Sequence, residues 1–248
     1  GLNMSGHSKW HNIQAKKGKT DAARGAIFTK LGRELAVAAK GNPNPDTNSK
    51  LADVIAKAKA ANMPNENIKR SIAKAAGELG DKEYKELTYE GYGVAGSAVI
   101  IKTLTDNVNR TAGDIRSTMS KCGGQMGNNG CVSYMFDDKG ILVIERTVAL
   151  DEDTMMEYCL EAEAEDFIAS DDVYEVYTTP EAFSNARKYF EDKGITFLEA
   201  AIKMIPQNYI TLDGEKLASF RKMLDKLDEL DDVQDVYHNV ELPEEDDE

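Results

Sequence analysis

The sequence predicts a multi-domain α+β protein, in which an N-terminal three-helix domain precedes two ferredoxin-like α+β domains, one inserted in the other. Three observations predict this class. Apolar residues follow helical spacing up to about residue 77, short β-rich runs alternate with helical segments after residue 80, and 41% of the residues are hydrophobic, enough for buried cores. We expect domains at 4–80, at 81–136 joined with 206–240, and at 137–205, followed by an acidic tail at 241–248.

Three helices are predicted in the first eighty residues. The first covers about 26–40, where Phe28, Leu31 and Leu35 share one helical face. The second begins at an N-cap provided by Asn48 or Ser49, and the third ends near Gly77. Residues 5–25 are basic and poor in large apolar residues, which predicts a weakly ordered arm.

The rest of the chain alternates between strands and helices, as α+β sandwiches do. Strands are expected at 98–104, 131–136, 141–145, 173–178, 196–204, 208–212 and 233–240. Helices are expected at 109–122, 150–164, 180–193 and 215–230. Because 141–205 forms a complete strand–helix series, the flanking pieces are expected to pair with each other around it.

Charge is distributed unevenly along the chain. The net charge is −14, which at first argues against a polyanionic partner. Residues 1–76, however, contain 14 Lys and Arg against 5 Asp and Glu, a net charge of +9, and residues 77–248 carry −23. This asymmetry indicates one basic binding region on an otherwise repelling molecule.

The basic region holds the candidate nucleic-acid-binding residues. Several cations along one surface bind phosphates largely through counterion release. The candidates are His7, Ser8, Lys9, Trp10, His11, Lys16, Lys17, Lys19, Arg24, Lys30, Arg33 and Lys40. Trp10 has two equally supported interpretations: its ring stacks on unpaired bases, or it anchors the arm to the helical domain.

Arg110 is a further candidate, at a predicted strand-to-helix junction. Asn107 or Asn109 is a suitable N-cap there. A cation is unfavourable near a helix N-terminus, so capping alone does not explain Arg110. We interpret this side chain as a buried structural tether or as a phosphate contact, with the tether slightly favoured.

Other motifs fail on their structural context. Residues 91–96 match GxGxxG, but a strand follows them where dinucleotide binding requires a helix. His7 and His11 lack further ligands for zinc. The many carboxylates show no isolated catalytic pair, and no nucleophile motif is present. The sequence therefore predicts no cofactor, no metal site and no enzymatic activity.

The cellular compartment is predicted to be the cytoplasm. No apolar run reaches the length of a membrane span, and residues 1–4 do not begin a signal peptide. Cys122, Cys131 and Cys159 are odd in number and lack CxxC spacing, which favours a reducing compartment and thiols buried as small apolar groups. The sequence does not predict an oligomeric state.

Several blocks of the chain, in the same order, resemble the YebC/PmpR family of probable transcriptional regulators. They include Met4 to Trp10, Arg24 to Lys30, Tyr89 to Gly93, Thr105 to Thr111, Gly123 to Gly127, Val132 to Phe136 and Asp232 to Asn239. The resemblance implies a helical domain and two α+β domains, one inserted in the other, and DNA binding without catalysis. Some family members, including mitochondrial translational activators, are instead tied to the ribosome. Val94-Ala95 departs from the usual Pro-Gly of the family, and Cys131 replaces a common Ser.

Two classes of function therefore remain open. The first is a regulator that binds DNA, or an RNA-binding translation factor at the ribosome. RNA suits an arm with Trp, His and Lys, and the sequence shows no clear helix-turn-helix for reading DNA. The second is a ligand-responsive or scaffolding module, which needs an apolar pocket with converging polar groups.

Overall fold

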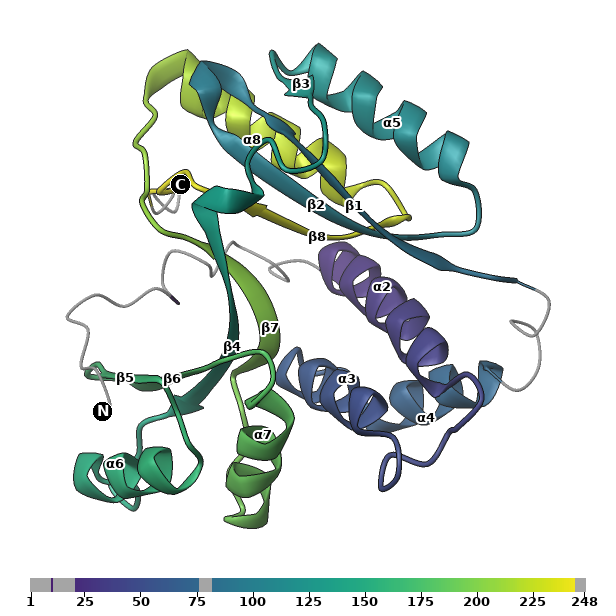
Figure 1. Ribbon diagram of the computed structural model, residues 1–248. Coiled ribbons are helices and arrows are strands. Elements are labelled where there is room, and N and C mark those ends of the chain that lie inside the picture. The colour runs from purple at the N-terminus through teal and green to yellow at the C-terminus, as the bar shows by residue number, and fades with distance from the viewer. Residues whose placement is uncertain (1–9, 11–20, 76–81, 244–248) are drawn as a thin grey trace. The chain divides into compact units, whose positions relative to one another are not determined.

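The structure is a computed structural model that describes residue 10, residues 21–75 and residues 82–243. These residues form seven α-helices and two four-stranded sheets (Figure 1), which confirms the predicted α+β class. The chain divides into two compact units, one from residues 1–80 and 138–203 and the other from residues 81–137 and 204–248. The boundaries of the three expected domains stay a prediction.

Three helices make up the described part of the helical region: α2 (Asp21–Ala39), α3 (Ser49–Ala60) and α4 (Asn65–Lys74). Their core contains Leu35, Leu51 and Ala58, which are fully buried. The expected start of the first helix was wrong, because α2 begins five residues before position 26. Alanine, the strongest helix former, occupies positions 22 and 23 and favours this extension despite Gly25.

Asn48 connects the end of α2 to the start of α3. Its side-chain oxygen accepts a hydrogen bond from the Leu51 amide at 3.2 Å, which caps α3 as predicted. Its side-chain nitrogen donates to the carbonyl oxygens of Ala38 and Asn42, each at 2.8 Å. One side chain therefore satisfies backbone groups on both sides of the loop.

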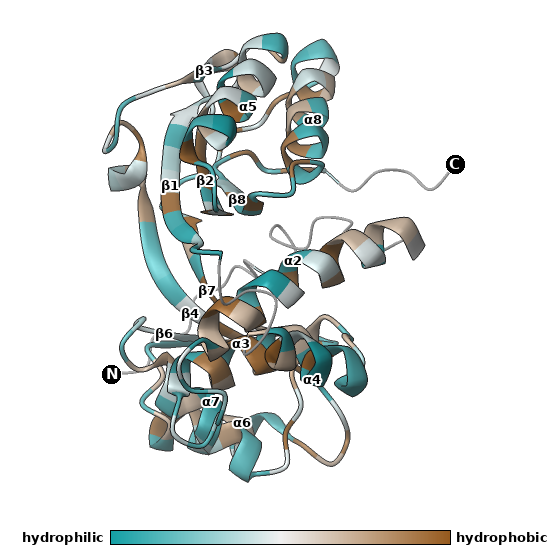
Figure 2. Cartoon of the chain, turned by 90° about the vertical axis from the view of Figure 1, so that its right-hand side faces the viewer, coloured by the Kyte–Doolittle hydropathy of each residue, from teal (hydrophilic) through white to brown (hydrophobic). Residues whose placement is uncertain are grey.

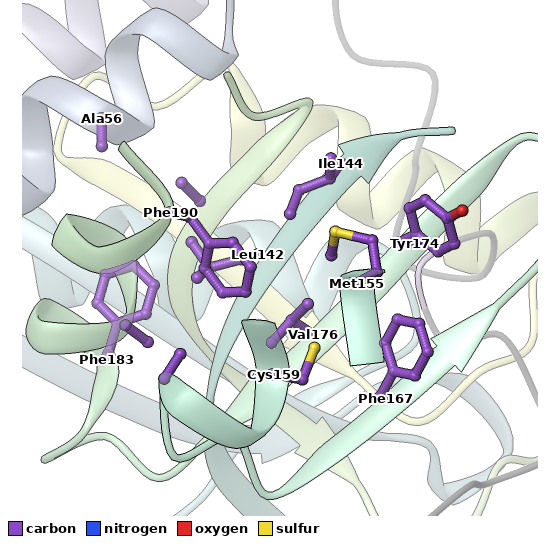
Figure 3. Close-up of a cluster of buried hydrophobic side chains, with 13 residues drawn as sticks. Ala56, Leu142, Ile144, Met155, Cys159, Phe167, Tyr174, Val176, Phe183 and Phe190 are labelled. Carbon is purple, nitrogen blue, oxygen red and sulfur yellow. The ribbon is translucent and has the colours of Figure 1, made fainter. Parts of the chain in front are cut away.

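The first sheet has the strand order of a ferredoxin-like domain. Its elements are β4 (Phe136–Glu145), α6 (Glu152–Glu161), β5 (Asp166–Ala169), β6 (Val173–Thr178), α7 (Phe183–Asp192) and β7 (Glu199–Pro206). The strands lie in the order β5-β6-β4-β7. Figure 3 shows the core, a single cluster of buried residues that includes Phe167, Tyr174, Phe183, Phe190 and also Ala56 of α3. The helical region and this sheet thus share buried residues within one unit.

An ion pair also joins α3 to α7. Asp53 accepts hydrogen bonds from Nε of Arg187 at 2.8 Å and from the hydroxyl of Ser184 at 2.5 Å. Arg187 is 6% exposed, and its guanidinium also contacts Glu191 at 2.8 Å. The buried guanidinium is therefore paired with two carboxylates, as a buried charge requires.

The second sheet contains a central hairpin. Its strands are β1 (Lys85–Tyr92), β2 (Ala98–Thr105), β3 (Gln125–Met126) and β8 (Val233–His238), in the order β3-β1-β2-β8. The three registers that join them are antiparallel. Helices α5 (Val108–Lys121) and α8 (Gly214–Asp228) bury Ile115 and Phe220 with strand residues such as Val99.

The residues that match GxGxxG form the connection between β1 and β2. A 3-10 turn, Val94–Gly96, follows β1, and β2 comes directly after it. No helix N-terminus is therefore presented to a pyrophosphate within this segment. Ala95 adopts a positive φ of 58°, and a Cβ at Gly93 would lie 2.4 Å from the Ser97 hydroxyl oxygen.

Two expected strands are absent from the described residues. The segment predicted at 131–136 forms a 3-10 turn, Ser133–Met135, before β4 begins, and the segment predicted at 208–212 forms only a single bridge between Ile210 and Val240. Both segments contain β-formers but lack a neighbouring strand to complete a ladder. Strands β1, β3 and β5 were not predicted. Within the described ranges, no helix has both the length and the apolar character needed to cross a membrane.

Candidate nucleic-acid interface

Helix α2 carries three of the candidate cations, and a fourth, Lys40, follows its last residue. Lys30, Arg33 and Lys40 are three and seven residues apart, so they lie on the side of the helix opposite the buried Leu35. Arg24 is exposed in the first turns of the same helix, and Lys40 is exposed just beyond its end. The structure thus brings three of the predicted cations to one helix face.

The acidic Glu34 of α2 is held by another helix. Nζ of Lys57, on α3, lies 3.1 Å from a carboxylate oxygen of Glu34, and both side chains are partly buried. This pairing neutralises the carboxylate beside the cationic face. Glu34 is therefore engaged within the helical region.

Further cations of the helical region were not among the predicted site residues. Lys50 and Lys59 on α3 and Lys69, Arg70 and Lys74 on α4 are exposed. Residues 21–75 contain ten Lys and Arg against five Asp and Glu. The sequence signal that finds these cations is position: on α4 they alternate with Ile68 and Ile72, so the apolar spacing places them outward.

Most arm candidates lie outside the described residues. These are His7, Ser8, Lys9, His11, Lys16, Lys17 and Lys19. Their role in binding stays a prediction.

Trp10 is the arm residue that the structure describes, and it is 8% exposed. Its backbone N–H donates to Oε1 of Glu175 on β6 at 2.8 Å, and the Tyr177 hydroxyl donates to the same oxygen at 2.6 Å. This placement corresponds to the anchoring interpretation, although the hydrogen-bond partner belongs to the ferredoxin-like sheet and not to the helical region. Within the described residues, the second oxygen of Glu175 is buried and has no hydrogen-bond partner.

Arg110 holds the start of α5 against β8. Its guanidinium donates to both oxygens of Asp232, from Nε at 3.1 Å and from one terminal nitrogen at 3.0 Å, and to Asp106 at 2.9 Å. Asp232 also accepts from the Thr111 hydroxyl at 2.7 Å. The hydrogen bond from Arg110 lowers the pKa of Asp106. Arg110 is thus tethered, but its side chain is 46% exposed and not buried.

Glu90 organises a surface loop that the sequence did not single out. Its buried carboxylate accepts backbone hydrogen bonds from Gly130 at 2.6 Å, Val132 at 3.1 Å and Ser133 at 2.6 Å. Burial alone would raise the pKa of this carboxyl, but these hydrogen bonds outweigh burial and hold its pKa below the ordinary value of 4.5. The loop presents Tyr134, which is 71% exposed. Glu90 and its partners are about 40 residues apart, so no local pattern links them.

Tyr92 adds a second aromatic ring to this loop surface. Its hydroxyl donates to the carbonyl oxygen of Cys131 at 3.2 Å, and the residue is 41% exposed. The side-chain amide nitrogen of Gln207 donates to the carbonyl oxygen of Tyr134 at 3.2 Å. The loop, held at its backbone, therefore presents Tyr134 beside Tyr92 of β1, and both rings are accessible.

The cysteines are free thiols in differing surroundings. Cys122 and Cys159 are buried, and Cys131 is half-buried. Burial raises the pKa of Cys159 to about 12, so this thiol stays protonated at neutral pH. In the part of the chain that the structure describes, no three His, Cys, Asp or Glu side chains gather as metal ligands.

Comparisons with known proteins cover almost the whole chain. The family model for the TACO1/YebC protein N-terminal domain matches residues 8–78, and the model for the TACO1/YebC second and third domain matches residues 84–240. A probable transcriptional regulatory protein of Clostridium botulinum is 59% identical over 243 residues, which cover 97% of this chain and 98% of that protein. One from Acetivibrio thermocellus is 55% identical and covers 95% and 98%.

A solved structure is also similar. The crystal structure of a conserved hypothetical protein from Aquifex aeolicus matches with a TM-score of 0.79 at 42% identity. The match covers 96% of this chain and 98% of that one.

Proposed function

The chain belongs to the TACO1/YebC family, and from that premise we propose that it is a non-enzymatic regulator of gene expression that binds nucleic acid, foremost duplex DNA, through its basic helical region. The names of its relatives, probable transcriptional regulatory proteins, support the regulatory role. We expect it to act in the cytoplasm.

One observation carries the proposal: cations are concentrated at the N-terminal end of an acidic chain. Residues 1–76 carry +9 and the remainder −23. In the helical region, Lys30 and Arg33 of α2, with Lys40 just beyond its end, lie on the side away from the buried Leu35. Phosphates bound there would release counterions, and the acidic remainder would be repelled, which favours one orientation on the nucleic acid.

Structured RNA, including ribosomal RNA, is a second candidate partner. It is favoured by two exposed rings, that of Tyr134 on the loop that Glu90 holds and that of Tyr92 at the end of β1, which contacts this loop. Aromatic side chains of this kind stack on unpaired bases, which duplex DNA does not offer. The two partners are distinguished by competing a duplex DNA fragment against purified ribosomes for the same labelled protein.

The experiment that tests the proposal reverses charges on the arm. Lys16→Glu, Lys17→Glu and Lys19→Glu together are expected to abolish binding to labelled duplex DNA and to RNA, as measured by fluorescence anisotropy. The sequence predicts a weakly ordered arm, and charges on such a segment contribute little to folding, so the unfolding midpoint should not change.

A matched control is available on α8. Lys216, Lys222 and Lys226 are exposed there, and changing all three to Glu alters the net charge by the same amount. This control should retain most of the affinity. If both triple variants weaken binding equally, the net charge and not the basic region governs binding, and the proposed site is wrong.

A further inference from the structure

Helices α3 and α4 are joined by a short, fully specified turn. The turn consists of the four residues 61–64, between Ala60 and Asn65. Asn62 adopts the left-handed conformation, with φ at 64°, and the amide of Met63 donates to the carbonyl oxygen of Ala58 at 3.0 Å. This arrangement is the Schellman end of a helix, with the buried Met63 packing behind it and Pro64 starting the next helix.

Helix α2 packs against both members of this pair. Gly32 of α2 meets α4 at close range, because a Cβ at Gly32 would lie 3.1 Å from the hydroxyl oxygen of Ser71. Ile68 of α4 is buried in the shared core. One side of α4 is therefore packed against α2, and the opposite side faces away from the shared core.

The outward side of α4 is polar and cationic. Asn65, Glu66, Lys69, Arg70 and Lys74 are exposed there. Only Glu66 opposes the three cations, and its contact with Lys69 is long, at 4.0 Å. Figure 2 shows the hydrophilic colour along much of α4.

We infer that α3, the turn at 61–64 and α4 form a helix-turn-helix reader whose second helix, α4, enters the major groove of duplex DNA. The inference rests on the proposed function and names the element that does the reading. In helix-turn-helix proteins, a first helix supports a pair joined by a turn of three to four residues, and the second helix of the pair meets the base edges.

The chemistry of α4 fits this groove. Lys and Arg donate to the O6 and N7 atoms of guanine, and Asn pairs with adenine, all in the major groove of B-form DNA. That groove is about 12 Å wide and admits a helix, whereas the major groove of A-form RNA is too narrow for side chains to read. The three cations on one short helix also match the negative charge of the groove walls.

The test removes the cations of α4 in the full-length chain. Lys69→Ala, Arg70→Ala and Lys74→Ala together should weaken binding to a random-sequence DNA duplex by roughly tenfold or more. The matched control, Lys216→Ala with Lys222→Ala and Lys226→Ala on α8, should bind as the unchanged protein does. Circular dichroism and the unfolding midpoint check that both variants fold.

A second probe reports on the groove itself. In a duplex containing 7-deazaguanine and 7-deazaadenine, the major groove lacks its N7 acceptors while the phosphates are unchanged. The unchanged protein should bind this duplex more weakly than ordinary DNA. The α4 variant, having lost the donors, should show little further loss.

Three results would overturn the inference. An α4 variant that binds as tightly as the unchanged protein, while the arm variant loses binding, would leave the arm as the contact. An RNA duplex bound as tightly as DNA, and equally weakened by the α4 changes, would replace groove reading by backbone contact. If the unchanged protein binds neither a DNA duplex nor RNA, the proposed function fails together with the inference. The first two results overturn the inference alone.

Discussion

Among individual residues, Glu90 shows how a buried charge fixes a surface feature. The carboxylate is 6% exposed and accepts three backbone hydrogen bonds from the loop that carries Tyr134. Hydrogen bonds to an ionised acceptor are stronger than those to a neutral one. The cost of burying the charge is offset by these bonds, so the loop has one preferred conformation.

Replacing this carboxylate by an amide should destabilise the protein. Glu90→Gln leaves one backbone N–H facing a donor, and the free energy of unfolding should fall by about 1–3 kcal/mol. Glu86→Gln, which changes an exposed carboxylate on the same strand, should change it by less than about 0.5 kcal/mol. Urea unfolding at neutral pH measures both.

The stabilisation that Glu90 provides should depend on pH. The folded state lowers the pKa of Glu90, so its contribution to stability is complete above the unfolded value of 4.5 and is lost as the pH falls through the folded pKa. The difference in stability between the unchanged protein and Glu90→Gln should therefore shrink under acid conditions. A difference that stays constant from neutral pH to below 4.5 would contradict this account.

Among the elements, α5 depends on a polar cluster at its N-terminus. Asp232 is buried and accepts hydrogen bonds from Arg110 and Thr111, whereas Asp106 is more exposed and accepts a hydrogen bond from Arg110. The cluster joins the first turn of α5 to the start of β8. It thus explains the cation that the capping interpretation of this junction left unexplained.

The two carboxylates of this cluster should differ in importance. Asp232→Asn places an amide nitrogen among donors in a buried site and should lower the free energy of unfolding by about 1–3 kcal/mol. Asp106→Asn weakens one partly exposed pair and should cost less than about 1 kcal/mol. Denaturant unfolding of the two variants measures the difference, and equal losses would show that Asp232 does not hold the helix.

At this scale the sequence predicted the helices better than the strands. The apolar spacing on α3 and the cap at Asn48 were visible locally, and both are confirmed. Strand β1 was missed because Gly91 and charged residues interrupt its alternation, and its pairing with β2 supplies the stability that its composition does not. The strand predicted at 131–136 was wrong, since Glu90, far away in sequence, holds that segment as a loop.

The candidate site was predictable only in part, for a related reason. Charge segregation is a property of the sequence, so the basic region could be recognised from composition. The burial of Trp10 against Glu175 and the pairing of Arg110 with Asp232 are long-range contacts that no local pattern encodes. The break between α3 and α4 was visible in the sequence, but the packing of α2 against both helices, on which the inferred reader depends, is long-range and was not.

For the whole molecule, the account depends on the contrast between a basic N-terminal region and an acidic remainder. The cations of the arm, of α2 and of α4 belong to one part of the chain, which carries +9 over residues 1–76. Such a region binds a phosphate chain by releasing its counterions, and each phosphate neutralised makes affinity more dependent on salt.

The dependence of affinity on salt tests this central claim most directly. The affinity for duplex DNA is measured over a series of salt concentrations. If roughly five phosphates are engaged, the logarithm of the affinity should fall with the logarithm of the salt concentration at a slope of about −4.5. For the Lys16→Glu, Lys17→Glu, Lys19→Glu variant, any residual slope should be much shallower. An affinity that does not change with salt would contradict the account.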